Sequence, residues 1–189
     1  MAIDGIAIII NGSLISSPDQ VDELIDLNKK LDISFIFTQA KSSESFDGGE
    51  ISKMGLSVLN FFDESSMLVM SKNAKQYFQL KNYILKKAKH FEKNPVCKLF
   101  YVTSGKWAED INIKKTLSIH KKQLENLNYF SSVDYIPYGF NIIINEFRKL
   151  ERSNEIEISL TAYSGEIAHP FRKHTAQFSE KILVEIIVH

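Results

Sequence analysis

The stretch Ile33–Lys41, with the sequence ISFIFTQAK, is the strand from which the fold can be built outward. It is apolar enough for the interior of a sheet and ends in a polar Gln-Ala-Lys triplet. Successive strand side chains point to opposite faces, so Gln39 and Lys41 share a face and lie about 6–7 Å apart. A neighbouring strand that carries Asp4 would bring a carboxylate, a carboxamide oxygen and an ammonium group to one point.

Composition limits the class of protein. The chain has 189 residues, 44% hydrophobic and 24% charged, which is typical of one soluble globular domain or of one domain with a small appendage. Lys plus Arg and Asp plus Glu both number 23, so no net charge draws the protein to nucleic acid or to a membrane. The single cysteine, Cys97, lies in an apolar run, which favours a buried thiol in a reducing compartment. There is no signal peptide and no apolar run of roughly 18–20 residues, so we expect a cytoplasmic protein without a membrane partner.

The first third of the chain alternates between strand and helix patterns. An apolar run is followed by Asn11-Gly12, the strongest short signal for a β-hairpin. Ser17 and Pro18 are typical of a helix start, as the cap and the first-turn residue. We predict strands over 3–10, 13–16 and 33–41, helices over 19–30 and 50–62, and a polar, glycine-rich loop over 42–49.

The same alternation continues further along the chain. We predict helices over 75–91, 114–127 and 140–152, and strands over 96–103 and 133–136, which together indicate a sheet with helices on its faces. Residues 155–162 alternate like a half-exposed strand, and 181–188 form a β-branched run. We therefore divide the chain into an α/β domain over 1–152 and a β-rich appendage, or the start of a following domain, over 153–189.

The two ends of the chain are unusual for a natural domain. Only three residues precede Asp4, and the last apolar run stops at His189. Unpaired strand edges at a terminus promote aggregation. We therefore expect this chain to be a piece of a longer protein.

Two motifs resemble a known superfamily. Ile3-Asp4-Gly5-Ile6, followed downstream by Gln39-Ala40-Lys41, resembles the Mrr-like branch of the PD-(D/E)xK nucleases, in which glutamine replaces the acidic residue of the last motif. A longer stretch is similar to the amino-terminal region of AIPR proteins, the abortive-infection phage-resistance family. That similarity is carried by residues 3–12, 35–62 and 94–107. It implies a restriction-endonuclease-like α/β fold, with a mixed central sheet flanked by helices. We expect that the helix which precedes the aspartate strand in this fold is missing here.

This resemblance implies a metal-dependent phosphodiesterase that uses Mg²⁺ or Mn²⁺. Such a cation polarises the phosphate and acidifies water, and Mg²⁺ is held by carboxylates, carbonyl oxygens and waters. Asp4 would be the main ligand, Gln39 a neutral oxygen ligand and the Ala40 carbonyl a third. Lys41 would orient or deprotonate the attacking water and stabilise developing negative charge.

A second acid is expected because Gln39 carries no charge. In many members of the superfamily that acid is a glutamate on a helix ahead of the aspartate strand, so an upstream helix in the full gene would support catalysis. Within this chain Glu44, Asp47 and Glu50 lie just past the motif. The alternative is that Glu50 is a first-turn acid that complements the helix dipole and that Asp47 begins a turn.

Lysines cluster locally despite the neutral total. A series of lysines that contains a single acid, Glu92, could neutralise phosphates, although such a series is more often a solvated helix face. We select Lys86, Lys87 and Lys106 as candidate nucleic-acid contacts, and Trp107 as a residue that either stacks on a base or packs structurally. The series comprises Lys72, Lys75, Lys81, Lys86, Lys87, Lys89, Lys93 and Lys98, and it is followed by Lys114, Lys115, Lys121 and Lys122.

Other chemistries lack their motifs: there is no P-loop, no Gly-x-Gly-x-x-Gly, no Gly-x-Ser-x-Gly and no zinc-like spacing of histidines with Cys97. The first hypothesis is a nuclease fragment of an AIPR-type phage-defence protein, with DNA favoured over RNA as the substrate. The alternative is a non-catalytic, degenerate nuclease-fold module that binds nucleic acid, a protein partner or the remainder of its parent protein. Nucleases that cut both strands often act as pairs, so we also consider a homodimer.

Overall fold

A five-stranded sheet forms the centre of the protein in the computed structural model, which describes residues 2–63 and 71–151. The strand order is β2-β1-β3-β4-β5. β1 runs antiparallel to β2 and β3, whereas β3, β4 and β5 are parallel to one another, so the sheet is mixed as the resemblance implied. The strands are β1 (Gly5–Ile10), β2 (Ser13–Leu14), β3 (Ile33–Lys41), β4 (Val96–Thr103) and β5 (Ser132–Tyr138).

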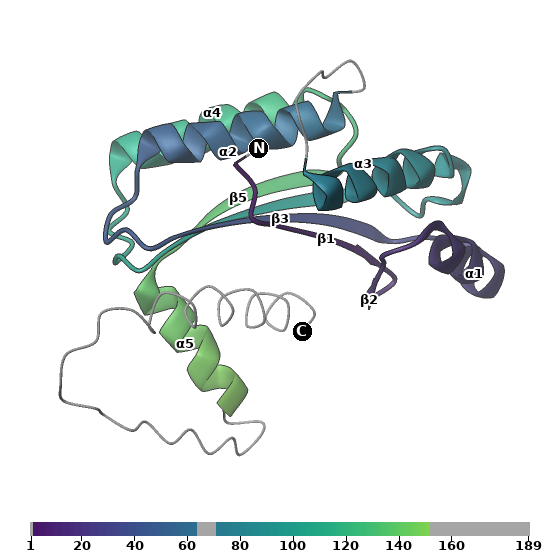
Figure 1. Cartoon of the computed structure of the whole chain (residues 1–189), viewed down its shortest axis with the longest axis horizontal. Helices are drawn as coiled ribbons and strands as arrows, with labels where there is room; N and C mark the ends of the chain where they lie inside the picture. Colours follow the sequence, from purple (N-terminus) through teal and green to yellow (C-terminus); the bar gives the residue numbers. More distant parts are fainter. Residues whose placement is uncertain (1, 64–70, 152–189) are drawn as a thin grey trace.

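Helices cover both faces of this sheet (Figure 1). α2 and α4 lie side by side on one face, with α3 further along it, and α5 lies on the opposite face (Figure 1). The mixed α/β class predicted from the alternating pattern is therefore confirmed. The helices are α1 (Pro18–Asn28), α2 (Gly48–Phe62), α3 (Lys72–Leu85), α4 (Ile111–Glu125) and α5 (Phe140–Glu151).

The two faces of β3 explain why it is the central strand. On one face, Phe35 and Phe37 pack edge-to-face against Phe62 and Phe61 of α2, with ring centroids 5.3 and 5.2 Å apart. On the other face, Ile36 packs in a smaller cluster with residues of β4 and α5. Burial on both faces requires the nearly continuous apolar run seen in the sequence.

The start of the chain folds as its turn residues predict. Asn11 and Gly12 both have positive φ angles, 51° and 80°, as a two-residue hairpin turn requires. β2 is shorter than the predicted 13–16 because the chain turns into α1 at its Ser17 cap. Ser17 and Gln20 form a capping box there, with Pro18 in the first turn.

Several predicted boundaries differ from the observed ones. The helix predicted over 75–91 begins earlier, because Ser71 caps it, and ends at Leu85. The chain then makes a short 3₁₀ turn over 88–90 and reaches the sheet, where the His90 carbonyl accepts a hydrogen bond from the Leu31 N–H. α4 likewise begins at Ile111, earlier than predicted, because Asp110 caps it.

The predicted strands over 155–162 and 181–188, and with them the appendage over 153–189, lie outside the described residues. Within the described residues, no helix is both long and apolar enough to cross a membrane.

Candidate functional site

Asp4 contacts the Gln-Ala-Lys triplet through the Ala40 backbone, where β3 ends and just before β1 begins. One carboxylate oxygen of Asp4, Oδ2, accepts a hydrogen bond of 2.8 Å from the Ala40 N–H. The Asp4 N–H donates to the Thr38 carbonyl at 2.9 Å. The aspartate is therefore held directly against the triplet by the antiparallel pairing of β1 with β3. The N–H and C=O of one strand residue leave the strand on the same side, so the Ala40 carbonyl lies on the Asp4 side.

Gln39 is buried, with 2% of its surface exposed. Its carboxamide oxygen is buried and has no hydrogen-bond partner among residues 2–63 and 71–151. Native proteins leave few buried polar atoms unpaired, and each costs about 1–3 kcal/mol. An oxygen of this kind at the Asp4 end of β3 is suited to a hard cation, which prefers oxygen ligands.

Lys41 lies beside an acid from the following helix. Its Nζ is 2.8 Å from Glu50 Oε2, and Lys53 Nζ is 2.5 Å from the other oxygen of the same carboxylate. Hydrogen bonds from Lys41 and then Lys53 lower the pKa of Glu50 to about 2, so the carboxylate is ionised at neutral pH. Glu50 in turn raises the pKa of Lys53. The three side chains form one ion-pair network.

The first turn of α2 brings Glu50 to this position. The Asp47 side chain caps the helix by accepting the Glu50 N–H at 2.9 Å. The predicted turn at Asp47 and the predicted loop over 42–49 are therefore wrong at their end, because Asp47 caps a helix that begins at Gly48. Glu50 is a first-turn acid, as the alternative interpretation had it, and it also contacts Lys41. Glu44 is exposed in the loop between β3 and α2. Of the three candidate second acids, Glu50 is the one paired with the motif lysine.

The loops that follow β3 and β4 meet at the carboxyl ends of these two strands. The Ser104 hydroxyl donates to the backbone carbonyls of Ser42 and Ser43, at 3.2 and 3.0 Å, and so ties the loop after β3 to the end of β4. A Cβ on Gly105 would overlap the Glu44 carbonyl, so only glycine permits this approach. The candidate site therefore has a fixed wall on the β4 side.

Tyr101 and Lys53 belong to this site but were not selected from the sequence. Tyr101 is the β4 partner of Gln39 in the parallel register and is fully buried. Aligning the polar carboxyl ends of the two predicted strands is a signal that would have found it. Lys53 follows Glu50 by three residues, which on a helix places the two side chains on one face.

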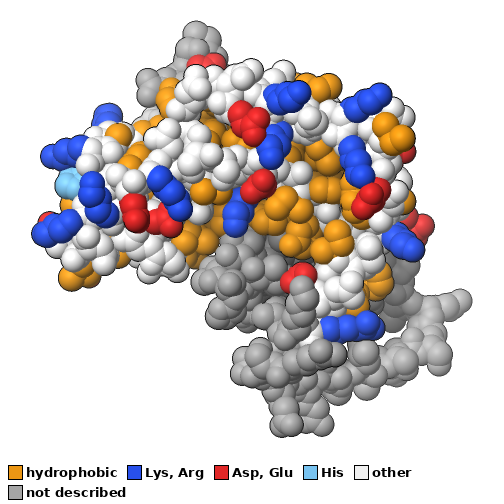
Figure 2. All heavy atoms as spheres, turned by 180° about the vertical axis from the view of Figure 1, so that it is seen from behind, with side chains coloured by type: hydrophobic (Ala, Val, Ile, Leu, Met, Phe, Trp, Pro, Cys, Tyr) orange, Lys and Arg blue, Asp and Glu red, His pale blue; other side chains and the backbone are white. Residues whose placement is uncertain are grey.

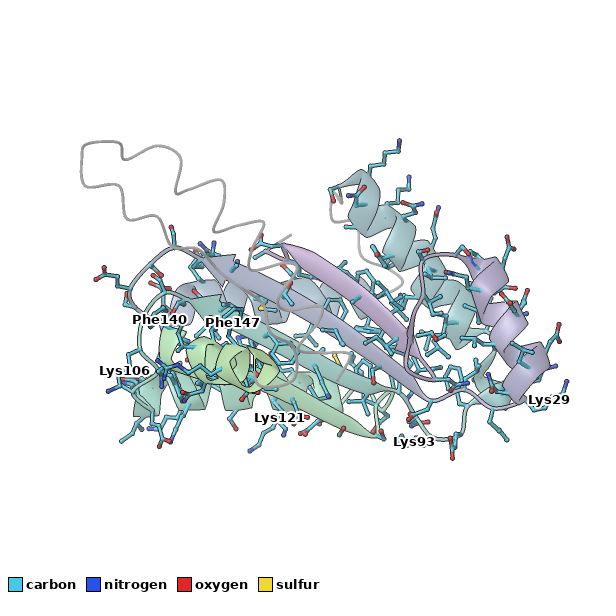
Figure 3. All side chains as sticks on the ribbon, turned by 90° about the horizontal axis from the view of Figure 1, so that it is seen from below. Lys29, Lys93, Lys106, Lys121, Phe140 and Phe147 are labelled. Carbon is cyan, nitrogen blue, oxygen red and sulfur yellow. The ribbon has the colours of Figure 1, made fainter. Side chains whose placement is uncertain are left out.

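The predicted nucleic-acid contacts do not come together. Lys106 is exposed just after β4, at the candidate site's end of the molecule, whereas Lys86 and Lys87 follow α3 near the other end of the parallel strands. In Figure 3, Lys106 lies at one end of the molecule, and Lys93 and Lys29 lie toward the other end. Lys87 is also paired with Asp22 of α1 at 2.8 Å.

Lys81 of the lysine series is not on a solvated face. It is fully buried, donates to the Phe61 carbonyl at 3.0 Å and lies over the Phe78 ring, 4.1 Å from its centroid. Figure 2 shows Lys and Arg side chains interspersed with acidic ones on one face of the molecule, with no continuous basic surface there. The solvated-face interpretation therefore does not apply to every lysine of the series.

Trp107 has a structural environment. Its half-buried ring packs edge-to-face on Phe46, with centroids 4.8 Å apart. Its backbone N–H donates to the Asn141 side chain at 3.2 Å. These contacts support the packing interpretation over base stacking.

The residues that could hold a divalent cation are Asp4, Gln39, the Ala40 carbonyl and Glu50. This set mixes two acids with two neutral oxygens, and among the described residues no group of three or more His, Cys, Asp and Glu side chains is arranged to bind a metal. Comparisons with protein-family models, curated proteins and solved structures found no match to this chain.

Proposed function

We propose that this chain is a restriction-endonuclease-like module of the AIPR type that hydrolyses phosphodiester bonds in nucleic acid, with Mg²⁺ or Mn²⁺, as part of cytoplasmic phage defence. The observation that carries the proposal is the meeting of Asp4 with the Gln39-Ala40-Lys41 end of β3, where Gln39 presents an unpaired buried oxygen. The mixed sheet with helices on both faces is compatible with that fold family. DNA is the favoured substrate, with RNA as the alternative.

The ligand set proposed for the cation is Asp4, the Gln39 carboxamide oxygen, the Ala40 carbonyl and Glu50. When bound, the cation polarises the phosphate and acidifies water. Asp4 supplies a charged oxygen that β1 holds in place, and burial keeps the Gln39 side chain in one conformation. Glu50 supplies the second negative charge that the neutral Gln39 lacks, because its low pKa keeps it ionised.

Lys41 is the side chain that we propose to act directly in catalysis. Its position is set by β3 and by the ion pair with Glu50 at 2.8 Å. An ammonium group at this point orients the attacking water and stabilises charge that develops on the phosphate oxygens. Lys53 holds the other Glu50 oxygen, so Glu50 stays near the site while it exchanges partners.

One observation favours the alternative, a non-catalytic module that binds nucleic acid or a protein partner. Both oxygens of the Glu50 carboxylate are ion-paired with lysines, and two ammonium groups against one carboxylate leave a net positive charge that disfavours a bound cation. A degenerate nuclease site would retain such a network for stability alone. Catalysis and binding therefore have to be measured separately.

The test is cleavage of supercoiled plasmid and of labelled RNA by the purified chain in Mg²⁺ and in Mn²⁺. Lys41→Ala is the diagnostic variant. Lys114→Ala is its matched control, because it removes another ion-paired lysine, whose Nζ is 2.8 Å from Glu109. The nuclease proposal predicts cation-dependent cleavage that disappears in Lys41→Ala and persists in Lys114→Ala.

Equal cleavage by all three proteins would point to a contaminating nuclease and contradict the proposed site. Absence of cleavage together with retained binding to plasmid or RNA in a gel-shift assay would support the non-catalytic module instead. Absence of both would refute nucleic-acid cleavage and nucleic-acid binding by this chain, and the module that binds a protein partner would be the remaining form of the alternative.

A further inference from the structure

Phe140, the first residue of α5, has an aromatic side chain that packing does not explain. It is 57% exposed and belongs to neither apolar cluster of the described residues. Its ring has no aromatic partner in that part of the chain, whereas the other exposed aromatic residue, Tyr129, packs against Phe130. Single exposed apolar side chains are common, so the meaning of this one depends on what holds it and what surrounds it.

The backbone around Phe140 is held against the loop that follows β4. The Phe140 N–H donates to the Gly105 carbonyl at 2.9 Å, and the Asn141 side chain accepts the Trp107 N–H at 3.2 Å. A Cβ on Gly139 would lie 2.5 Å from the Trp107 nitrogen and 2.6 Å from the Gly105 carbonyl oxygen, so this close approach requires glycine. The exposed ring is therefore carried by a backbone that is fixed in place.

These contacts place the backbone of Lys106 next to that of Phe140. Lys106 lies between Gly105 and Trp107, the two loop residues that bond to the start of α5. Figure 3 shows Lys106 and Phe140 at the same end of the molecule. Lys106 is exposed and has no ion-pair partner among residues 2–63 and 71–151. An ammonium group without a protein counter-charge and an exposed aromatic ring thus occupy neighbouring positions.

This pair lies at the same edge of the sheet as the candidate site. β4 ends at Thr103, which is the partner of Lys41 in the parallel register, and Gly105 follows two residues later. The Ser104 hydroxyl also ties this loop to the one after β3. In open α/β sheets, ligands bind outside the carboxyl ends of the parallel strands. The exposed ring and the ammonium group are therefore at the edge where a ligand of the candidate site would lie.

We propose that Phe140 and Lys106 form a nucleotide subsite, in which the ring stacks on an unpaired base and the ammonium group contacts an adjacent phosphate. Stacking on aromatic rings, combined with positive charge along the backbone, is how proteins bind single strands without sequence preference. A base in a duplex must first be unstacked and unpaired, so the subsite selects single strands over duplexes. This inference rests on the proposed function, because it takes nucleic acid as the ligand and names the unpaired strand as the form that is bound.

The test is binding of labelled oligothymidylate, oligouridylate and a blunt DNA duplex, measured by fluorescence anisotropy in EDTA so that no cation-dependent cleavage occurs. We expect Phe140→Leu to weaken binding to the single strands roughly 5-fold or more, as for the loss of one stacked base. Phe140→Tyr keeps the ring and should bind like the wild type. Tyr129→Leu is the matched control, because it removes an exposed aromatic side chain that precedes β5, whereas Phe140 follows it.

The duplex separates base stacking from general attraction to nucleic acid. Phe140→Leu should weaken duplex binding by a smaller factor than single-strand binding. Equal losses on both would overturn the selection of an unpaired base. Equal binding of the single strands by Phe140→Leu and the wild type would overturn the subsite.

Salt dependence isolates the contribution of Lys106. For single strands, each phosphate contact adds about 0.7 to the slope of log affinity against log salt concentration. Lys106→Ala should therefore reduce the slope by about 0.7, and Lys93→Ala, toward the other end in Figure 3, should leave it unchanged. An unchanged slope in Lys106→Ala would refute the phosphate contact.

Thermal unfolding tests whether Phe140 is a packing residue instead. Phe140→Leu should leave the melting temperature unchanged, because the ring belongs to neither apolar cluster of the described residues. A lower melting temperature together with unchanged affinity for the single strands would mean that the ring stabilises the fold, which overturns the inference.

The two proposals fail in different ways. Cation-dependent cleavage by the wild type, together with equal binding by the wild type and Phe140→Leu, would refute the subsite alone. Single-strand binding that depends on Phe140, without cleavage of plasmid or RNA, would support the subsite and refute the nuclease. If the wild-type chain binds none of the three probes, the subsite is wrong, and the plasmid assay decides the nuclease proposal by itself.

Discussion

A methyl group added at Gly55 tests how closely α2, the helix that carries Glu50, must approach α4. A Cβ at this position would lie 2.5 Å from His120 Cγ and 2.8 Å from both Cβ and Nδ1 of the same residue. Carbon atoms in ordinary contact are about 3.5–4.0 Å apart, so roughly 1 Å must be gained by moving a helix or by displacing the histidine. The atoms involved are close to the His120 backbone, so a simple rotation of the ring tip does not relieve the overlap.

Two opposing effects set the size of the change in Gly55→Ala. Overpacking a tight contact costs about 1–3 kcal/mol. Replacing glycine with alanine inside a helix gains about 0.5–1 kcal/mol. We expect a net loss of about 1 kcal/mol in the free energy of unfolding. In a His120→Ala background the overlaps with Cγ and Nδ1 are removed and only the one with Cβ, at 2.8 Å, remains, so the same substitution should cost less than in the wild type.

The assay is urea unfolding of the wild type, both single variants and the double variant. Gly48→Ala is the control, because a Cβ there meets Ile113 and Thr116 at ordinary distances of 3.6 and 3.7 Å. It should change stability by less than about 0.5 kcal/mol. Equal changes in stability on adding Gly55→Ala to the wild type and to His120→Ala would show that the His120 ring is not in close contact with Gly55.

Burial is the main cause that lowers the pKa of His120 below its ordinary 6.5, so below pH 6.5 the unfolded chain binds more protons than the folded chain. The free energy of unfolding should therefore fall as the pH drops from 7.5 to 5.5. Urea midpoints measured over this range should vary less in His120→Leu than in the wild type. Glu50, with a pKa of about 2 instead of 4.5, adds stability above pH 4.5 that is lost as the pH falls toward 2, so acid unfolding followed by circular dichroism should be shallower in Glu50→Gln. Lys81→Ala should lower the free energy of unfolding, measured with urea, by about 2–5 kcal/mol, because it removes a buried side chain and the donor to the Phe61 carbonyl. The control is Lys75→Ala, which changes an exposed residue of the same helix. Equal effects of the two substitutions would contradict the burial of Lys81.

Much of the sheet could be predicted because its strands are marked by local signals. The Asn11-Gly12 turn identifies the first hairpin, and the apolar runs before Gln39 and Ser104 identify β3 and β4. The predicted contact between Asp4 and the triplet required only that β1 pair with β3, and an apolar β1 has few other places in the sheet. Hydrophobic periodicity and turn residues act locally, so they indicate strands and turns without knowledge of the tertiary contacts.

Features that depend on long-range packing could not be predicted in the same way. The lysine series contains Lys81 at a position that looks like the others, and its burial depends on the Phe61 carbonyl, 20 residues earlier in the chain. The choice of Glu50 over Glu44 depends on the path of the loop after β3 and on the Asp47 cap. Tyr101 escaped selection because its importance comes from its partner in the sheet register.

The pairing of β3 with one strand before it and one far after it has a consequence for the order in which the protein can fold during synthesis. Asp4, the Gln-Ala-Lys triplet and Glu50 all lie within the first 50 residues, so the β1–β3 pair and α2 can leave the ribosome together. Tyr101 follows Gln39 by 62 residues and joins β3 only after β4 has been made. Closing this longer loop costs more chain entropy, so the pairing of β3 with β4 should be the slower step. Until it occurs, one edge of β3 is exposed in the nascent chain and is the point at which misfolding is most expected.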